Sequence, residues 1–186
     1  RLGTNSLVDL VVFGRRAGKH MAQYCDETSF CPLPDDPAAQ IISEINRIRF
    51  NEGGEKAINL RNEMQQTMTR NVGVFRTDQT LSDGLNDIRE LRERFANIEI
   101  DDKGSYFNTD LLEAWELGCL LELSEVTTLS ALARTESRGA HARDDYVERD
   151  DETWLKHSLC TLVENGYQLD YKPVTLGRYE PKPRVY

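Results

Sequence analysis

Apolar residues recur at helical spacing in four consecutive segments between residues 36 and 133. The four stripes consist of Ile41, Ile45 and Ile48; Leu60, Met64 and Met68; Leu81, Leu85, Ile88 and Phe95; and Leu111, Trp115, Leu121 and Val126. Short loops separate the segments, so consecutive helices have to run antiparallel to bury their stripes together. The sequence therefore predicts a mainly α protein built on an antiparallel bundle of three to four helices.

Local signals mark where these helices begin. Asp36 followed directly by Pro37 is typical of an N-cap and the first helical residue. Thr77 is expected to cap the third helix of the bundle, and residues 108–110 the fourth. Arginine and glutamate alternate along residues 89–94, and we interpret this face as solvated.

An additional helix is expected before the bundle, beginning at residues 4–6, where threonine, asparagine and serine side chains are able to cap free amides. Residues 7–13 are apolar on nearly every side of this helix, which is typical of a helix buried on several faces. Such a helix does not suit the outside of a small bundle. We therefore expect its natural neighbour to be missing, and the chain to be a piece of something longer.

The pattern changes after Ala133. Residues 134–151 are polar and follow neither a helical nor a strand period. Two β-prone runs then flank Asn165-Gly166, which predicts a hairpin with these two residues at the centre of a type I′ turn. We expect three regions: residues 1–35, the helical bundle 36–133, and residues 134–186 with a small irregular part and a β-hairpin.

Composition limits the classes of function. The net charge is −9, which argues against nucleic-acid binding, and the hydrophobic fraction of 39% with 30% charged residues is that of an ordinary soluble protein. No apolar run is long enough to span a membrane. The four cysteines are too scattered for a metal site and are expected to be reduced thiols. A helical interaction module whose acidic face docks a basic protein remains an alternative.

His141 is the one histidine in a charged setting, because Arg138 and Arg143 flank it and Glu136 is near in the sequence. Such neighbours are able to tune a general base. We favour a buried ion-pair network that braces two domains, since the segment offers partners for its own charges. No nucleophile elbow, phosphate-binding loop or zinc motif is present, so no catalytic residue is assigned.

Four stretches resemble one known family. They are residues 1–15 (RLGTNSLVDLVVFGR), 107–110 (FNTD), 134–154 with RTESRGAHAR and RDDETW, and 179–186 (YEPKPRVY). In this order they are similar to the C-terminal part of the succinate dehydrogenase and fumarate reductase flavoprotein subunits, and bacterial succinate dehydrogenases are favoured. L-Aspartate oxidase shares parts of this pattern and remains an alternative, as does fumarate reductase.

The resemblance implies that residues 1–35 are the end of an FAD-binding domain. It implies that Arg1 grips a carboxylate of succinate or fumarate, which suits a planar, permanently charged donor. It also implies that Ser6 and Leu7 meet the pyrimidine edge of FAD. There the positive end of the helix dipole would favour the negative charge that collects when hydride reaches the flavin, by on the order of 0.3–2 kcal/mol.

The resemblance further implies partners and a place in the cell. The parent enzyme would oxidise succinate to fumarate and pass electrons through FAD to an iron–sulfur subunit and quinone. It would lie on the cytoplasmic side of the bacterial inner membrane, held by membrane anchor subunits. The 186 residues alone are expected to bind no FAD and to be inactive, because the nucleotide-binding fold of this family lies upstream.

Overall fold

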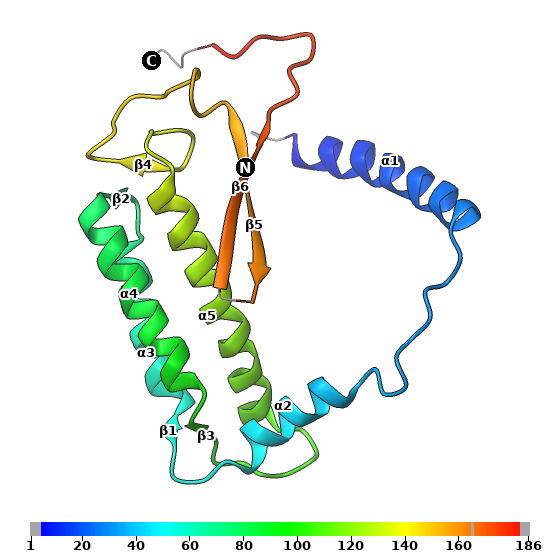
Figure 1. Ribbon diagram of the computed structural model, residues 1–186, viewed down its shortest axis with the longest axis vertical. Coiled ribbons are helices and arrows are strands. Elements are labelled where there is room, and N and C mark those ends of the chain that lie inside the picture. The colour runs from blue at the N-terminus through cyan, green and yellow to red at the C-terminus, as the bar shows by residue number, and fades with distance from the viewer. Residues whose placement is uncertain (1–4, 165, 183–186) are drawn as a thin grey trace. The chain divides into compact units, whose positions relative to one another are not determined.

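The computed structural model describes residues 5–164 and 166–182, and the chain divides into two compact units, Arg1–Gln40 and Ile41–Tyr186 (Figure 1). The described residues form five helices: α1 (Ser6–Glu27), α2 (Ala39–Phe50), α3 (Ala57–Asn71), α4 (Asp78–Phe95) and α5 (Thr109–Ala133). The strands are β1 (Glu55–Lys56), β2 (Phe75–Arg76), β3 (Ile98–Glu99), β4 (Ala142–Arg143), β5 (Lys156–Val163) and β6 (Gly166–Pro173). The prediction of a mainly α protein with a C-terminal hairpin is confirmed.

The first unit consists mainly of α1. This helix begins at Ser6, as predicted, and none of its residues is buried within the unit. Asn5 occupies the N-cap position, but its side chain makes no capping hydrogen bond, and Thr4 lies outside the described residues. Of the side chains at residues 4–6 that were expected to cap this helix, that of Asn5 does not do so. The backbone amides of the first turn have no side-chain acceptor at the N-cap.

The second unit is organised around α3, α4 and α5, which lie side by side along their length (Figure 1). Their predicted stripes contribute to two clusters of buried side chains. The smaller cluster consists of Val72, Leu81 and Ala131. The buried members of the larger cluster, the main core, are Ile48, Leu60, Met64, Ile88, Leu91, Ile98, Ile100, Ala114, Leu117 and Leu121. Phe95 and Trp115 pack against this core while remaining partly exposed. Close-packed apolar contact of this kind supplies most of the stability of such a bundle.

The helix starts follow the sequence signals closely. The Thr77 hydroxyl accepts from the Thr80 amide at 3.2 Å, and the Thr80 hydroxyl accepts from the Thr77 amide, which closes a capping box on α4. Asn108 Oδ1 accepts from the Leu111 amide at 2.7 Å and caps α5. The helix after Asp36 begins at Ala39 rather than Pro37, because Pro37 and Ala38 form a turn before regular helix is established.

The β-hairpin pairs β5 with β6 in antiparallel register, with Val163 opposite Gly166. Gly166, at φ 120°, is the first residue of β6 and is paired with Val163. The type I′ turn predicted at Asn165-Gly166 includes Asn165, which lies outside the described residues. Glycine fits this paired position because it has no Cβ to oppose a positive φ.

Two short parallel pairs tie distant segments together. β1 pairs with β3, and β2 pairs with β4, so that Arg76 lies opposite Arg143. The second pair brings the connection between α3 and α4 to the polar segment, which we define as residues 134–154. No helix in the described part of the chain is long and apolar enough to cross a membrane.

Candidate functional site

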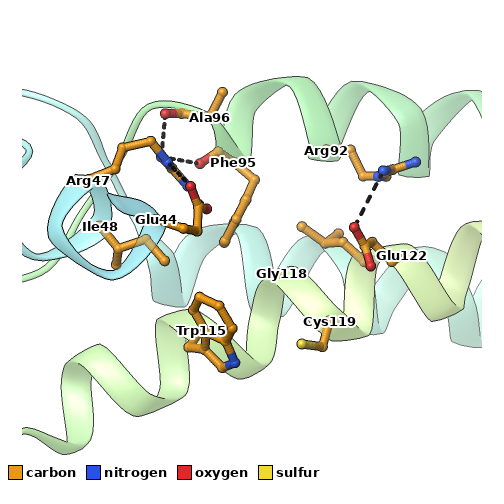
Figure 2. A pocket seen from close by; sticks show the side chains of 11 residues that line it. Glu44, Arg47, Ile48, Arg92, Phe95, Ala96, Trp115, Gly118, Cys119 and Glu122 are labelled. Carbon is orange, nitrogen blue, oxygen red and sulfur yellow. Dashed lines mark hydrogen bonds and ion pairs between the residues drawn. The ribbon is translucent and has the colours of Figure 1, made fainter. Parts of the chain in front are cut away.

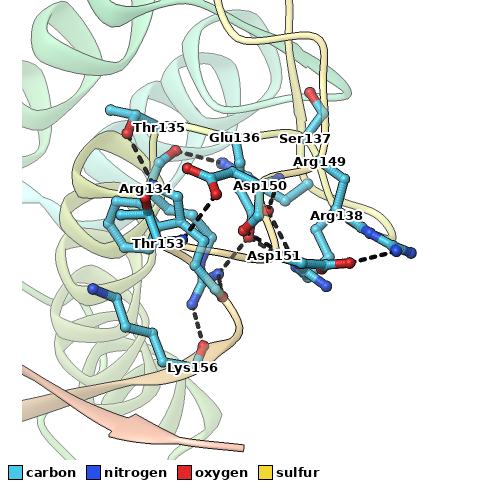
Figure 3. A network of polar contacts seen from close by, with 12 residues as sticks. Arg134, Thr135, Glu136, Ser137, Arg138, Arg149, Asp150, Asp151, Thr153 and Lys156 are labelled. Atoms are coloured by element: carbon cyan, nitrogen blue, oxygen red, sulfur yellow. Dashed lines mark hydrogen bonds and ion pairs between the residues drawn. The ribbon is translucent and has the colours of Figure 1, made fainter. Parts of the chain in front are cut away.

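The polar segment begins where α5 ends and continues to β5, and Glu136 is its centre (Figure 3). The Glu136 side chain is fully buried. Its Oε1 accepts from Arg134 Nη1 at 2.6 Å and from Arg138 Nε at 2.8 Å, and its Oε2 accepts from Arg138 Nη2 at 3.0 Å. The Asp150 backbone amide donates a further bond at 3.0 Å. The carboxylate is thus paired on both oxygens.

Burial alone would raise the pKa of Glu136. Hydrogen bonds from Arg138, the Asp150 amide and Arg134 outweigh burial, and the pKa lies below its ordinary value. Glu136 is therefore ionised at neutral pH, with no proton to give and no lone pair free for a substrate. The arrangement is that of a structural ion pair.

Arg134 connects the end of α5 to the start of the hairpin. Besides Glu136, its guanidinium donates to the backbone oxygens of Trp154 at 3.0 Å and Lys156 at 2.6 Å. It lies 5.0 Å from the centre of the Trp154 ring, and the indole nitrogen of that ring donates to Thr135 Oγ1 at 3.0 Å. One arginine therefore holds the carboxylate, the ring and the first backbone oxygens of the hairpin together.

The chain then folds back through a second set of pairs. Arg138 Nη2 donates to Asp151 Oδ1 and Arg149 Nη2 to Asp151 Oδ2, each at 2.6 Å. Asp150 Oδ1 accepts from the amides of Glu152 and Thr153 at 3.0 and 2.8 Å. Asp150 and Asp151 are thus engaged with backbone amides and with arginines, as predicted for the charges of this segment.

Arg143 connects the end of α5 with the start of α4. Its side chain is fully buried, and Nη1 donates to the oxygens of Ala131 and Leu132 at the end of α5. Nε and Nη2 donate to Asp145 at 2.7 and 2.8 Å, and Asp145 Oδ2 accepts from the Asp78 amide at the start of α4. The hydrogen bonds from Arg143 lower the pKa of Asp145 to about 2, against a small opposing effect of burial. The Arg143–Asp145 pair therefore satisfies backbone groups at the C-terminal end of α5 and at the N-terminal end of α4.

His141 lies between these groups with both ring nitrogens occupied. Arg76 Nη1 lies 2.9 Å from Nδ1, and the Arg134 backbone oxygen lies 3.1 Å from Nε2. An arginine only donates, so we assign Nδ1 as the acceptor and Nε2 as the protonated nitrogen. Burial, with the charges of Arg76, Arg143 and Arg134, lowers the pKa of His141. His141 is therefore a neutral structural link and has no free nitrogen for general-base work.

The predicted ion-pair network is present. It does not brace two units, as was expected, because it lies within the second unit, where it joins α5, the start of α4 and the hairpin. Sequence reasoning missed Arg76, which lies 65 positions before His141 and carried no local signal. It also placed Glu136 beside His141, whereas Glu136 pairs with the arginines on either side of it.

The residues assigned to cofactor and substrate lie in the first unit. Ser6 and Leu7 are the first two residues of α1, both exposed, and Leu7 has 74% of its surface accessible. Arg1 lies outside the described residues. In the part of the chain that the structure describes, no cluster of histidine, cysteine or acidic side chains is arranged to hold a metal ion.

Comparison with known proteins identifies the family. Residues 61–186, which include most of α3, all of α4 and α5 and the polar segment, match the family described as fumarate reductase flavoprotein C-term. The chain belongs to this family. It is the C-terminal region of a succinate dehydrogenase or fumarate reductase type flavoprotein subunit, and the family consists of FAD-dependent oxidoreductases.

Individual relatives agree with this assignment. The chain is 46% identical to the succinate dehydrogenase flavoprotein subunit of Rickettsia bellii, covering 100% of this chain and 33% of that protein. It is 39% identical to the fumarate reductase flavoprotein subunit of Haemophilus influenzae, covering 100% of this chain and 32% of that protein. The chain thus spans about a third of the length of the curated relatives it matches.

Solved structures share the fold. An Escherichia coli quinol fumarate reductase chain is 37% identical and superposes with a TM-score of 0.88, over 100% of this chain and 33% of that one. A chain of the Mycobacterium smegmatis Sdh1 complex is 31% identical with a TM-score of 0.82, over 97% of this chain and 31% of that one. Adenylylsulfate reductase of Archaeoglobus fulgidus, at 19% identity and a TM-score of 0.74, shows the fold alone.

Proposed function

We propose that this chain is the C-terminal third of a succinate dehydrogenase flavoprotein subunit, which oxidises succinate to fumarate with FAD as the hydride acceptor. The observation that carries the proposal is the 46% identity over the whole chain to a succinate dehydrogenase flavoprotein subunit. Fumarate reductase is the second candidate, supported by 39% identity to such a subunit over the same span. The domain boundaries at residues 35 and 133 belong to the same proposal.

The first turn of α1 has the features that a flavin edge requires. Its amides have no side-chain acceptor from Asn5, and the helix dipole places partial positive charge at this end. Ser6 and Leu7 lie there and would hold the pyrimidine edge of FAD, with Leu7 offering an exposed apolar side chain beside the amides. When bound, FAD supplies the acceptance of a hydride from succinate.

Arg1 would grip one carboxylate of the substrate. A guanidinium is permanently charged and donates two parallel hydrogen bonds to a carboxylate, which fixes both the position and the orientation of a dicarboxylate. Arg1 moves no proton in this role. It would orient the substrate relative to the FAD whose pyrimidine edge Ser6 and Leu7 would hold.

The second unit would serve as a scaffold. Its described polar groups at the network are paired with one another, which suits a rigid brace rather than a site of chemistry. The partners in this proposal are an iron–sulfur subunit and membrane anchor subunits, with the parent complex on the cytoplasmic side of the inner membrane. Retention of the chain by an immobilised iron–sulfur subunit, and not by an unrelated protein of equal charge, would support that assembly.

A chimera tests the proposed activity. The C-terminal third of the Rickettsia bellii subunit is replaced by this chain, and succinate-dependent reduction of an artificial electron acceptor is measured. We expect turnover in the chimera and none in the 186 residues alone supplied with FAD. An inactive chimera that folds and binds FAD would refute the proposal, and turnover by the isolated chain would refute its role as a part.

A substitution in the same chimera tests Arg1. Arg1→Lys keeps the charge but removes bidentate hydrogen bonding, and we expect a loss of kcat/KM of about 100-fold or more. The matched control is Arg15→Lys, the same exchange at an exposed position of α1, which should leave kcat/KM unchanged. Equal kcat/KM values for the two variants would exclude Arg1 from substrate binding.

A further inference from the structure

The outward face of α5 combines leucines with acidic residues and carries no basic residue. Between Thr109 and Ala133 the sequence contains no lysine, arginine or histidine, whereas aspartate and glutamate are frequent. We define the α5 stripe as Leu112, Glu116, Cys119, Leu120 and Leu123, which follow one another at i, i+4, i+7, i+8 and i+11 on one side of the helix and are all exposed. Leu112 and Leu123 have 56% and 62% of their surfaces accessible. The opposite face of the helix is buried in the bundle core.

A groove runs beside the stripe, between α2, the end of α4 and α5 (Figure 2). It encloses about 470 Å³. Ile48, Phe95, Trp115 and Leu121 provide its apolar walls. Phe95 approaches the α5 backbone at Gly118, where a Cβ atom would lie 2.8 Å from the ring. The stripe and the groove adjoin at Cys119, which belongs to both.

The positively charged side chains that line the groove, Arg47 and Arg92, are already paired within the chain. Arg47 Nη2 contacts Glu44 at 2.6 Å and its Nη1 reaches the Ala96 oxygen, while Arg92 is engaged by buried Glu125. Glu113 and Glu122 pair at long distance with Arg61 (4.0 Å) and Arg92 (3.8 Å), yet their side chains stay 59% and 58% exposed. Glu116 is exposed and has no ion pair among the described residues. The surface therefore presents negative charge flanking apolar side chains.

We propose that the α5 stripe and its groove dock a basic amphipathic helix of another protein. The leucines would receive the apolar side of that helix, and the glutamates at the margins would face its lysines or arginines. Charge complementarity selects this occupant, since the described cations at the groove are bound internally and do not repel it. The inference stands apart from the proposed function, because it uses only residues of the second unit.

The test uses a helical peptide of about 18 residues made of leucine and lysine, with leucines at helical spacing. Titration calorimetry with the full 186-residue chain should show saturable 1:1 binding that weakens as salt is raised. A peptide of the same composition with its leucines scrambled off one face is the ligand control. Equal affinity for both peptides would overturn the proposal, because charge alone would then explain binding.

Variants of the stripe separate apolar contact from charge. The double substitution Leu120→Glu with Leu123→Glu adds negative charge, which by itself would strengthen the attraction of a basic peptide. It also removes the two leucines that would contact the apolar side of that peptide. We expect the affinity to fall about tenfold or more. The matched control Ile58→Glu adds charge at an exposed position of α3 and should not weaken binding. Undiminished affinity in the stripe variant would overturn the proposal. The proposal would also be overturned if the chain formed a dimer that the stripe substitutions abolish and that the peptide does not displace.

Discussion

At the scale of single residues, the Glu136 side chain is fully buried and negatively charged. Hydrogen bonds from Arg134, Arg138 and the Asp150 backbone amide stabilise this charge. Glu136→Gln keeps the shape but leaves two poorly solvated guanidiniums without their carboxylate. We expect the free energy of unfolding to fall by about 3–5 kcal/mol. Urea denaturation measures this loss. The control Glu152→Gln, at an exposed position, should stay within about 0.5 kcal/mol of the parent, and equal losses would contradict the brace.

His141 gives the fold a pH dependence of its own. Burial and the charges of Arg76, Arg143 and Arg134 lower its folded-state pKa, so the unfolded chain binds more protons at this residue. Stability is therefore fully present above the unfolded pKa of about 6.5 and is lost as pH falls below it. We expect the urea midpoint to decrease between pH 7.5 and 5.5. His141→Gln, whose amide offers the same acceptor and donor without titrating, should decrease less over this range, whereas His157→Gln should behave as the parent. An unchanged slope in His141→Gln would exclude this residue as the cause.

At the scale of elements, the hairpin is attached to the bundle by side chains rather than by a sheet. Arg92 of α4 pairs with buried Glu125 of α5 and lies 5.4 Å from the centre of the Tyr167 ring on β6. Burial alone would raise the pKa of Glu125, but bonds from Arg89 and Arg92 lower it overall, so the anchor stays charged. The three elements therefore meet at one ionised cluster.

Removing the ring tests this attachment. Tyr167→Leu eliminates a cation–π contact of about 0.5–1 kcal/mol, which corresponds to hydrogen exchange two- to fivefold faster in β5 and β6. Exchange in α3 and in the core of α5 should not change. Tyr179→Leu, a matched substitution at a 79% exposed tyrosine, should leave the hairpin unaffected. Faster exchange throughout the second unit would instead indicate a general loss of stability.

The elements that local pattern determines could be predicted, and the contacts between them could not. Thr77 and Asn108 cap their helices as expected because capping depends on three or four neighbouring residues. Arg89 is exposed and Arg92 partly exposed, as expected of a solvated face. Local pattern did not show that packing of α4 against α5 also brings both to Glu125, more than 30 positions away. The Arg76–His141 bond has the same origin. The roles of Arg1, Ser6 and Leu7 came from resemblance, since no spacing in the sequence implies a flavin.

At the scale of the whole molecule, the two units differ in burial: none of the described residues of the first unit is buried, whereas the second unit has a buried core. α1 has 22 residues, and none of them is buried within its unit. More than half of the surface is accessible to water at each of four apolar residues, Leu7, Leu10, Val11 and Phe13. An apolar helix in water either frays or associates with another copy. We therefore expect protection of the α1 amides in hydrogen exchange to be weak at low protein concentration and to rise with it.

Two substitutions make this expectation specific. Leu10→Ser with Phe13→Ser removes apolar surface from α1 without touching the second unit, and it should abolish the dependence on concentration. Sedimentation should then show a monomer at every concentration. Ile58→Ser with Val74→Ser, at exposed positions of the second unit, should leave the association of the parent chain unchanged. A monomeric parent chain whose α1 amides are strongly protected would show that this helix needs no partner, and the expectation that its natural neighbour is missing would then fail.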